Sequence, residues 1–535
     1  MANIPTPDLR APHSAGQRRR VFLQSAAIVG ASVLLSRVLG FLREWVIADR
    51  IGSNALTDAY YAAFTIPDIL NYLLAGGALS VTFLPVFLRY FSAEQEEEAW
   101  RVFSIVLSVM SLLLCLLLIP AEIFAPVFTR WIAPGFTPEQ HVLVTRLTRI
   151  MLPAQAFFFV GGVLTAVQYA RGRFLVPSLA PLVYNGMIVA FGYLLSGRWG
   201  IDAFSWGVLA GSLLGNCLIQ VYGVSRLSPR FRFSWGLRHP GFRQFLRLTV
   251  PIMCGISLIF VDDWAMRWCG SFLVPASITW LGYGKTLMRV VVAIFGQSAG
   301  VASFPLLAKL AAERRLDEMK EGLQEALRHV ILTIVPVSVL MALLSRQIVY
   351  LLFSHTRLNL NDMEQTALAM MVFLVGAVGW GTQAILGRGF YALGDTLTPT
   401  LIGSGLALAW LPVYWFFGQR FQHMGLAAAS SLGVLLYTTA LGVVLFRRLR
   451  LSLGSILSYL LRIGAASAAS AVAAGCLGVL LNARIGWQSM GGSFLQCAAV
   501  SAAFLVCFFA AASLTGAASW HQWRTLLARK EGRRP

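Results

Sequence analysis

Charged side chains are scarce in this chain, because Asp, Glu, Lys and Arg make up only 12% of its 535 residues. A soluble protein of this length carries roughly twice that fraction, so the composition excludes an ordinary water-soluble protein. Cysteine is also sparse. The seven cysteines form no C-x-x-C pair and have no zinc-site spacing, so we interpret them as small apolar residues between helices.

Motifs for catalysis are missing as well. The sequence contains neither H-E-x-x-H nor G-x-S-x-G, and Gly284-Lys285-Thr286 lacks the glycine that a phosphate-binding loop requires at the position of Thr279. The adjacent acids Asp262 and Asp263 lack the further carboxylates of a metal site. We therefore predict no enzyme, no metal site, no cofactor and no direct use of ATP.

Apolar sequence is abundant: 57% of the residues are hydrophobic and the mean hydropathy is +0.70. Apolar stretches of about 20 residues recur, each long enough to cross a hydrocarbon core of about 30 Å. Helices satisfy their own backbone hydrogen bonds in lipid, and the alternating pattern of a membrane barrel is missing. We predict an all-α polytopic membrane protein with fourteen transmembrane helices, at about 21–49, 58–88, 102–128, 143–170, 176–196, 202–224, 245–270, 276–308, 327–352, 365–392, 397–418, 425–446, 456–481 and 493–516.

The net charge of +20 is concentrated in short loops between these spans, and the 226–247 loop alone contains six arginines and no acid. This distribution is typical of the basic loops that fix the orientation of a membrane protein, and it argues against a nucleic-acid partner. Because an even number of spans places both termini on one side, and the most basic loops lie on that side, we predict that both termini are cytoplasmic.

An internal repeat divides the chain. Tyr169-Ala-Arg-Gly172 is followed by Pro177, and Tyr391-Ala-Leu-Gly394 is followed by Pro399 at the same spacing. A second pair of segments, 81–85 and 301–305, ends in proline at nearly the same offset. A repeat of six helices gives two lobes with parallel orientation and a substrate site between them. The expected organisation is a cytoplasmic tail (1–20), an N-lobe (21–230), a C-lobe (231–452), two further helices (453–517) and a basic cytoplasmic tail (518–535).

Ionisable side chains inside the spans gather in the first two helices of each lobe, where charges are costly and usually functional. The cations among them are Arg37, Arg43, Arg267, Lys285 and Arg289. Arg37 and Arg43 lie within about 120° of each other around a helix, and Lys285 and Arg289 are stacked at i and i+4. Converging cations suit an anion with several oxygens, such as pyrophosphate. The alternative is internal ion pairing, of Arg43 with Glu44 or Asp58 and of Arg267 with Asp263.

Several motifs in order resemble the MurJ (MviN) family of lipid II flippases, over residues 25 to 450. They are Ser36-Arg37-Val38-Leu39-Gly40-Phe41-Leu42-Arg43 with Thr57-Asp58-Ala59, Ala133-Pro134-Gly135-Phe136, Arg173-Phe174-x-x-Pro177-x-x-x-Pro181 with Asn185, and Phe390-Tyr391-Ala392-Leu393-Gly394-Asp395-Thr396-x-Thr398-Pro399. The resemblance implies the fold of the MATE-like exporter superfamily and a location in the bacterial inner membrane. It also implies a groove for a lipid tail in spans 13 and 14, and proteins of cell-wall synthesis as candidate partners.

The resemblance carries residue roles to Arg37, Arg43 and Asp58, which fall on positions important in the family. Other positions depart from the family pattern. The family usually has an arginine where this chain has Asn71 and an acid where it has Gly76, and the usual Asp-Arg pair is Lys285-Thr286 here. Lys285 and Arg289 are candidates to replace the missing arginines.

The leading hypothesis is a flippase that moves undecaprenyl-pyrophosphate-linked peptidoglycan precursor outward by alternating access. Arg37, Arg43, Lys285 and Arg289 would bind the pyrophosphate. The cavity or gate would contain Glu44, Asp58, Asn71, Asp263 and Arg267. The first alternative is a flippase for another polyprenyl-linked oligosaccharide, such as an exopolysaccharide or O-antigen unit. A MATE-like drug exporter would require acids to dominate the cavity, and a glycan transferase would require a catalytic cluster that is missing. The coupling ion is left open.

Overall fold

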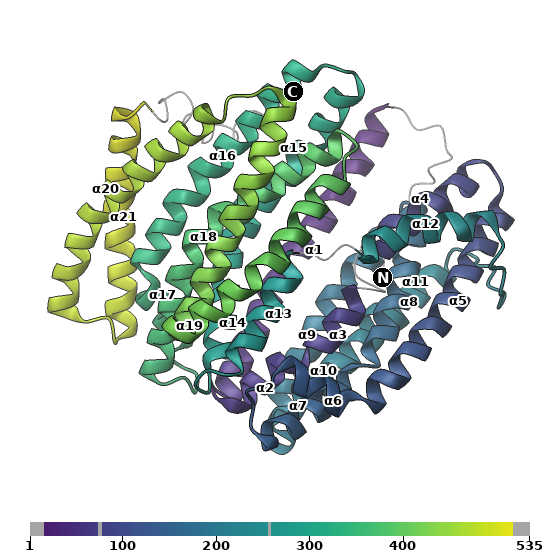
Figure 1. Ribbon diagram of the computed structural model, residues 1–535, viewed down its shortest axis with the longest axis horizontal. Helices are drawn as coiled ribbons and strands as arrows, with labels where there is room; N and C mark the ends of the chain where they lie inside the picture. The colour runs from purple at the N-terminus through teal and green to yellow at the C-terminus, as the bar shows by residue number, and fades with distance from the viewer. Residues whose placement is uncertain (1–14, 73–77, 255–257, 517–535) are drawn as a thin grey trace. The chain divides into compact units, whose positions relative to one another are not determined.

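The computed structural model describes residues 15–72, 78–254 and 258–516. Within these ranges every regular element is a helix (Figure 1), which confirms the all-α prediction. In the described ranges, ten helical stretches, each made of one to three consecutive elements, are long and apolar enough to cross a membrane. Whether the chain crosses it fourteen times stays a prediction.

The chain folds into two compact units. The first extends to Gly255 and includes Val274–Ala276, and the second contains Ile256–Leu273 and the chain from Ser277 onward. The first unit contains the helices α1 (Ala15–Arg50), α2 (Ala55–Ala63), α3 (Thr65–Leu70), α4 (Ala78–Ser92), α5 (Glu96–Ile123), α6 (Ala125–Ile132), α7 (Pro138–Met151), α8 (Ala154–Ala170), α9 (Leu175–Trp199), α10 (Asp202–Gly211), the π-helix η2 (Ser212–Leu218), α11 (Ile219–Ser225) and α12 (Pro240–Cys254).

The second unit contains the two long C-terminal helices as well as the second copy of the repeat. Its helices are α13 (Leu258–Gly270), α14 (Ser277–Val291), the π-helix η3 (Val292–Gln297), α15 (Ser298–Ala312), α16 (Leu316–Leu343), α17 (Ser345–Phe353), α18 (Leu360–Ala392), α19 (Leu397–Leu449), α20 (Leu453–Ile485) and α21 (Met490–Leu514). The last two pack on α16 and α17 through a core that includes Ile331, Ile463 and Phe504, so they are an integral part of this unit.

The first unit extends past the predicted lobe boundary at residue 230. Phe242 and Phe245 of α12 are buried in a core with Phe83 of α4 and Trp100 of α5. Thr249 of α12 also forms a hydrogen bond of 2.9 Å with Thr82. Amphipathic packing therefore assigns α12 to the first unit, whereas hydropathy alone had joined it to α13 in one predicted span at 245–270.

Several predicted spans are interrupted helices. The predicted span at 58–88 comprises α2, α3 and α4, and the span at 276–308 comprises α14, η3 and α15. The predicted spans at 397–418 and 425–446 are two arms of α19 that meet at Gln422, whose φ of 55° and ψ of −144° are not helical. The break at Gln422 lies in the predicted gap between these two spans. The interruptions within 58–88 and 276–308 were not predicted, because hydropathy detects apolar length.

Left-handed backbone positions repeat along the chain at an offset of 220 to 224 residues. The pairs are Gly52 and Ala276, Glu94 and Arg314, Gly172 and Gly394, Gly200 and Gln422, and Ser228 and Arg450. The φ angles of the members agree closely, for example 59° and 57° at Glu94 and Arg314. The other two positive-φ residues in the described ranges, Gly486 and Gly516, come after the second copy of the repeat and have no counterpart in it. The internal repeat inferred from a few side chains is therefore also a repeat of backbone turns.

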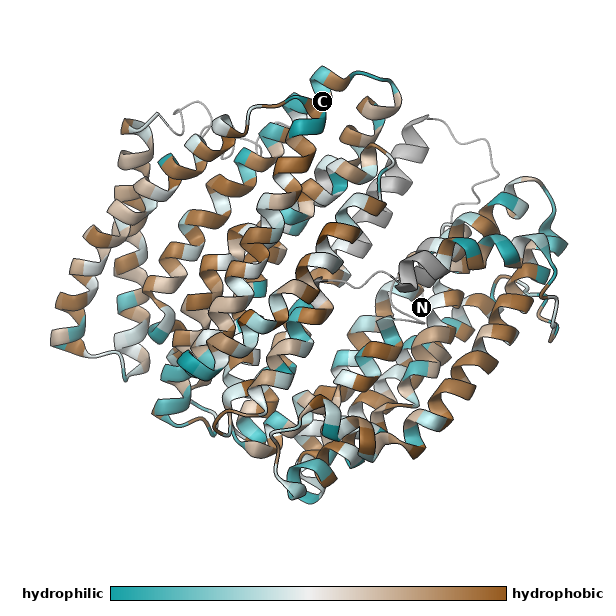
Figure 2. Cartoon of the chain, in the orientation of Figure 1, coloured by the Kyte–Doolittle hydropathy of each residue, from teal (hydrophilic) through white to brown (hydrophobic). Residues whose placement is uncertain are grey.

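Two helix starts show the same repeat. Thr137 before α7 and Asn359 before α18 each form a capping box, in which the side chain accepts from a backbone N–H three residues later and that residue's side chain bonds back. Such caps satisfy N–H groups that a helix leaves open at its first turn. Hydrophobic residues then occupy the middle of most helices and polar residues their ends (Figure 2), as expected for helices with lipid as solvent.

Candidate functional site

Both predicted cations of the first unit, Arg37 and Arg43, lie on the same continuous helix, α1. Arg37 is exposed and Arg43 is partly buried. Arg43 pairs with its neighbour Glu44 at 2.5 Å between Nη2 and Oε1. Internal pairing of Arg43 with Glu44, one of the alternatives weighed above, is thus present.

Glu44 connects α1 to α2. Its side chain is almost fully buried, with 3% of the residue exposed, and it accepts a hydrogen bond from the hydroxyl of Tyr61. A buried carboxylate is stable only with such partners. Glu44 therefore fixes the guanidinium of Arg43 and, through Tyr61, the position of α2 beside it.

Asp58 has a structural contact in the first unit. It is buried, and its Oδ2 accepts from the backbone N–H of Ala276 at 2.7 Å. Ala276 has a φ of 77°, an unfavourable angle for a residue with a side chain, and the carboxylate stabilises that turn. Asn71 lies half-buried at the C-terminal cap of α3, and Gly76 lies outside the described residues.

In the second unit, two acids of α13 and two cations of α14 form one network. The Nζ of Lys285 contacts Oδ2 of Asp262 and lies 2.6 Å from Oδ1 of Asp263. Nη2 of Arg289 lies 3.1 Å from both carboxylate oxygens of Asp263. The hydroxyl of Tyr414, from α19, donates to Oδ1 of Asp262. When all four groups are charged, the two carboxylates and the two cations of this network have a net charge of zero.

The two predicted cations of α14 differ in access. The side chain of Lys285 is 5% exposed and that of Arg289 is 45% exposed. Lys285, which was predicted to bind the pyrophosphate, is enclosed by two carboxylates. The physical reason is that Asp262 and Asp263 lie one helix away, where they offset the cost of burying an ammonium group. Arg289 is the member that solvent or a ligand can reach.

The remaining predicted residues lie near these groups on the same elements. Arg267, one turn beyond Asp263 on α13, is partly buried, and Thr286 is half-buried beside Lys285. Within the described part of the chain, no three His, Cys, Asp or Glu side chains gather as metal ligands. No sequence pattern pointed to Tyr61 or Tyr414, whose carboxylate partners lie 17 and 152 residues away along the chain.

Arg388 is a further cation within a long apolar helix, and it was not among the predicted site residues. It lies within α18, where its guanidinium packs over Gly300 of α15. The Nη1 atom is buried and has no hydrogen-bond partner among the described residues. The glycine makes this possible, since a Cβ there would collide with Nη1.

Charges enclosed by long apolar helices, on a duplicated helical frame, are the features of a polytopic membrane protein, and its fold is MATE-like. The fold matches an inward-facing multidrug resistance MATE family transporter with a TM-score of 0.60 and 13% identity, over 78% of this chain and 94% of that one. It matches a structure titled "Lipid II flippase MurJ, inward closed conformation" with a TM-score of 0.77 and 20% identity, over 94% of this chain and all of the other.

The chain belongs to the MurJ family. The family's sequence model, described as "Lipid II flippase MurJ", matches residues 47–514. The chain is 27% identical to "Lipid II flippase MurJ" of Burkholderia cenocepacia over 432 residues, which cover 78% of this chain and 83% of that protein. It is 27% identical over 414 residues to "Probable lipid II flippase MurJ" of Buchnera aphidicola subsp. Baizongia pistaciae, covering 77% of this chain and 80% of the relative.

Proposed function

We propose that this chain is a flippase that moves lipid II, the undecaprenyl-pyrophosphate-linked peptidoglycan precursor, from the cytoplasmic to the outer leaflet by alternating access. Its membership in the flippase family carries this proposal. Arg43 supports it, because a guanidinium held by Glu44 within an apolar helical protein is suited to a pyrophosphate.

The substrate contacts follow from the access of each cation. Arg37, Arg43 and Arg289 bind the pyrophosphate, and Lys285 holds Asp263 in place behind Arg289. Glu44, Asp58, Asn71, Asp263 and Arg267 line the cavity or form its gate in this proposal. Because Glu44 already pairs with Arg43 and Asp263 with Arg289, the incoming anion competes with these carboxylates for the same N–H donors.

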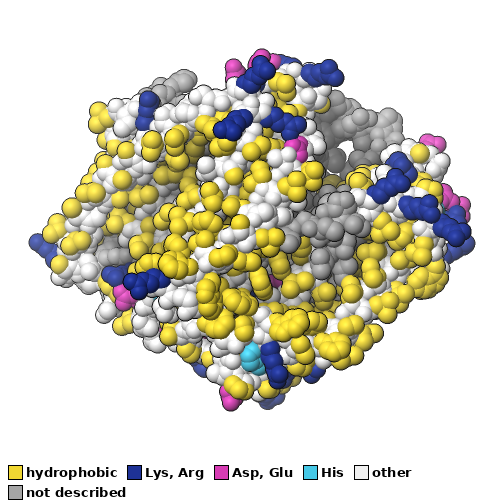
Figure 3. Space-filling view, in the orientation of Figure 1, with side chains coloured by type: hydrophobic (Ala, Val, Ile, Leu, Met, Phe, Trp, Pro, Cys, Tyr) yellow, Lys and Arg dark blue, Asp and Glu magenta, His cyan; other side chains and the backbone are white. Residues whose placement is uncertain are grey.

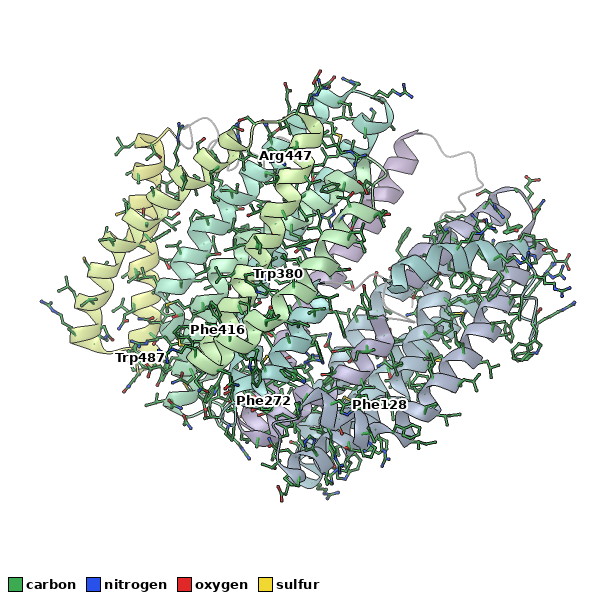
Figure 4. All side chains as sticks on the ribbon, viewed as in Figure 1. Phe128, Phe272, Trp380, Phe416, Arg447 and Trp487 are labelled. Carbon is green, nitrogen blue, oxygen red and sulfur yellow. The ribbon has the colours of Figure 1, made fainter. Side chains whose placement is uncertain are left out.

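In the proposed topology the chain crosses the bacterial inner membrane fourteen times, with both termini in the cytoplasm. In the second unit, Arg447 lies at one end of the helices, and Phe416, Phe272 and Trp487 lie at the other (Figure 4). Basic residues mark the cytoplasmic side and aromatic belts mark interfaces. An inside-negative potential favours outward movement of each negative charge by about 2.3 kcal/mol per 100 mV. Proteins that make and use the precursor are the expected partners.

The first test is complementation of a strain depleted of its own lipid II flippase. Wild-type chain should restore growth, and Arg37→Ala should fail to do so at equal membrane abundance. Arg484→Ala is the matched control, because Arg484 is an exposed arginine near the end of α20. Normal growth with Arg37→Ala would refute the role of that side chain.

The second test measures the substrate directly. Purified protein in vesicles should move labelled lipid II faster than a different glycan on the same undecaprenyl-pyrophosphate carrier. If the protein moved both lipids at equal rates, it would be a flippase, and the proposed preference for the lipid II head group would be refuted. Movement of the other glycan alone would overturn the proposal.

A further inference from the structure

A strip of chain between α11 and α12, Arg226–His239, combines cations with bulky apolar side chains. It contains four arginines, Arg226, Arg230, Arg232 and Arg238, and no acid. Its Phe231, Phe233, Trp235 and Leu237 are each at least half exposed. Water is a poor solvent for four such side chains in seven residues, so this surface requires a covering with apolar character.

The backbone of the strip is fixed on α5. Arg232 N–H donates to Ser104 Oγ at 3.1 Å, and Ser234 N–H donates to Ser108 Oγ at 3.4 Å. Gly236 allows close packing, because a Cβ there would lie 2.6 Å from Ile105. At the end of the strip, His239 Nε2 lies 2.9 Å from Glu98. These contacts hold the strip in a defined conformation against α5.

The arginines of the strip differ from those of the charged connector between α15 and α16 in the second unit. Arg315 pairs there with Glu313 and Glu318, and Lys320 pairs with Asp317. In the described structure, the guanidinium groups of Arg230, Arg232 and Arg238 contact no carboxylate. The α15–α16 connector is self-neutralised, because its cations pair with its own acids. The positive charge of the strip is therefore available to a partner outside the chain. Figure 3 shows Lys and Arg side chains mainly near the margins of the view and hydrophobic side chains across the face between them.

We propose that the strip Arg226–His239 is a docking surface for anionic phospholipid head groups, lying in the plane of the membrane interface. The rings of Phe233 and Trp235 meet edge to face with centroids 4.9 Å apart, and together they insert at the head-group level, where aromatic residues are favoured. The guanidinium groups bind lipid phosphates through paired N–H donors. Neutral lipids lack the net charge that the arginines attract.

The experiment measures lipid selectivity of the full-length protein in nanodiscs. Spin-labelled phosphatidylglycerol and phosphatidylcholine are compared for association with the wild type and with the triple variant Arg230→Gln, Arg232→Gln, Arg238→Gln. We expect the preference for phosphatidylglycerol to fall by up to roughly fivefold for each arginine removed. The matched control Arg314→Gln, Arg315→Gln, Lys320→Gln removes the same charge from the self-neutralised connector and should keep the preference.

Two further measurements separate docking from a general charge effect or a folding defect. The triple Arg→Lys variant at the same positions keeps the charge and should retain most of the preference. Brominated phosphatidylglycerol should quench the fluorescence that Trp235→Phe removes, and brominated phosphatidylcholine should quench it less. Unchanged selectivity in the Gln variant, an equal loss in the control, or no difference in quenching would each overturn the proposal.

Discussion

Replacing Lys285 with methionine should destabilise the second unit strongly. The ammonium group is nearly inaccessible and lies 2.6 Å from Asp263 while also contacting Asp262. At an effective dielectric constant of about 20, the attraction at this distance is roughly 6 kcal/mol, before desolvation and the partial exposure of Asp263 reduce it. Removal of one partner from a buried pair costs about 3–5 kcal/mol, because the other charge stays buried. We expect a loss of this size for Lys285→Met.

A double-mutant cycle tests whether charge balance is the cause. Lys285→Met leaves one negative charge in excess, and Asp262→Asn leaves one positive charge in excess. The combined variant restores balance, keeps the Asp263–Arg289 pair, and retains a side-chain oxygen for Tyr414. Thermal unfolding in detergent should therefore show that the double variant loses less stability than the two single losses added together. Additive losses, or a Lys285→Met protein as stable as the wild type, would refute the argument.

Two further predictions concern packing and pH. Gly161→Ala should cost about 1–3 kcal/mol, because a Cβ there would collide with the backbone carbonyl of Asn216; Gly186→Ala, with open space around it, should stabilise its helix by up to about 1 kcal/mol. Unfolding midpoints of the two variants would check this contrast, and equal shifts would contradict it. Hydrogen bonding from the backbone N–H and hydroxyl of Thr398 holds the pKa of Asp395 below its usual value. The charge of Asp395 therefore stabilises the fold above about pH 4 and ceases to do so as pH falls through the lower folded-state pKa, so the stability gap between wild type and Asp395→Asn should close there. A gap that stays constant from pH 7 to 3 would show that the carboxylate charge contributes nothing.

The helical class and the repeat were predictable from sequence because both depend on local patterns. Apolar length located the helices, and the repeated Tyr-Ala-x-Gly motif located the turns at Gly172 and Gly394. The break at Gln422 falls in the predicted gap between the spans at 397–418 and 425–446. The breaks that divide 58–88 and 276–308 were not predicted, and only the packing of Phe242 and Phe245 against α4 and α5 shows that α12 belongs with the first unit.

The candidate site was predictable in its residue types and only partly in its contacts. Charges within apolar spans identified α1, α13 and α14 correctly as charge-bearing helices. Sequence spacing could not show that Lys285 is enclosed while Arg289, one turn later, is accessible, because that difference depends on α13 and α19. Tyr414 donates to a carboxylate 152 residues away, and a single sequence contains no record of such a pair.

The paired left-handed turns show which property the two halves of the chain have in common. Five bends recur with nearly the same angles, although the residues at them range from glycine to arginine and glutamine. The electrostatics did not stay alike: one half sets a single glutamate against Arg43, and the other sets two aspartates against a lysine and an arginine. A symmetric scaffold has thus come to support asymmetric chemistry, so a charge found in one half is no guide to its counterpart in the other.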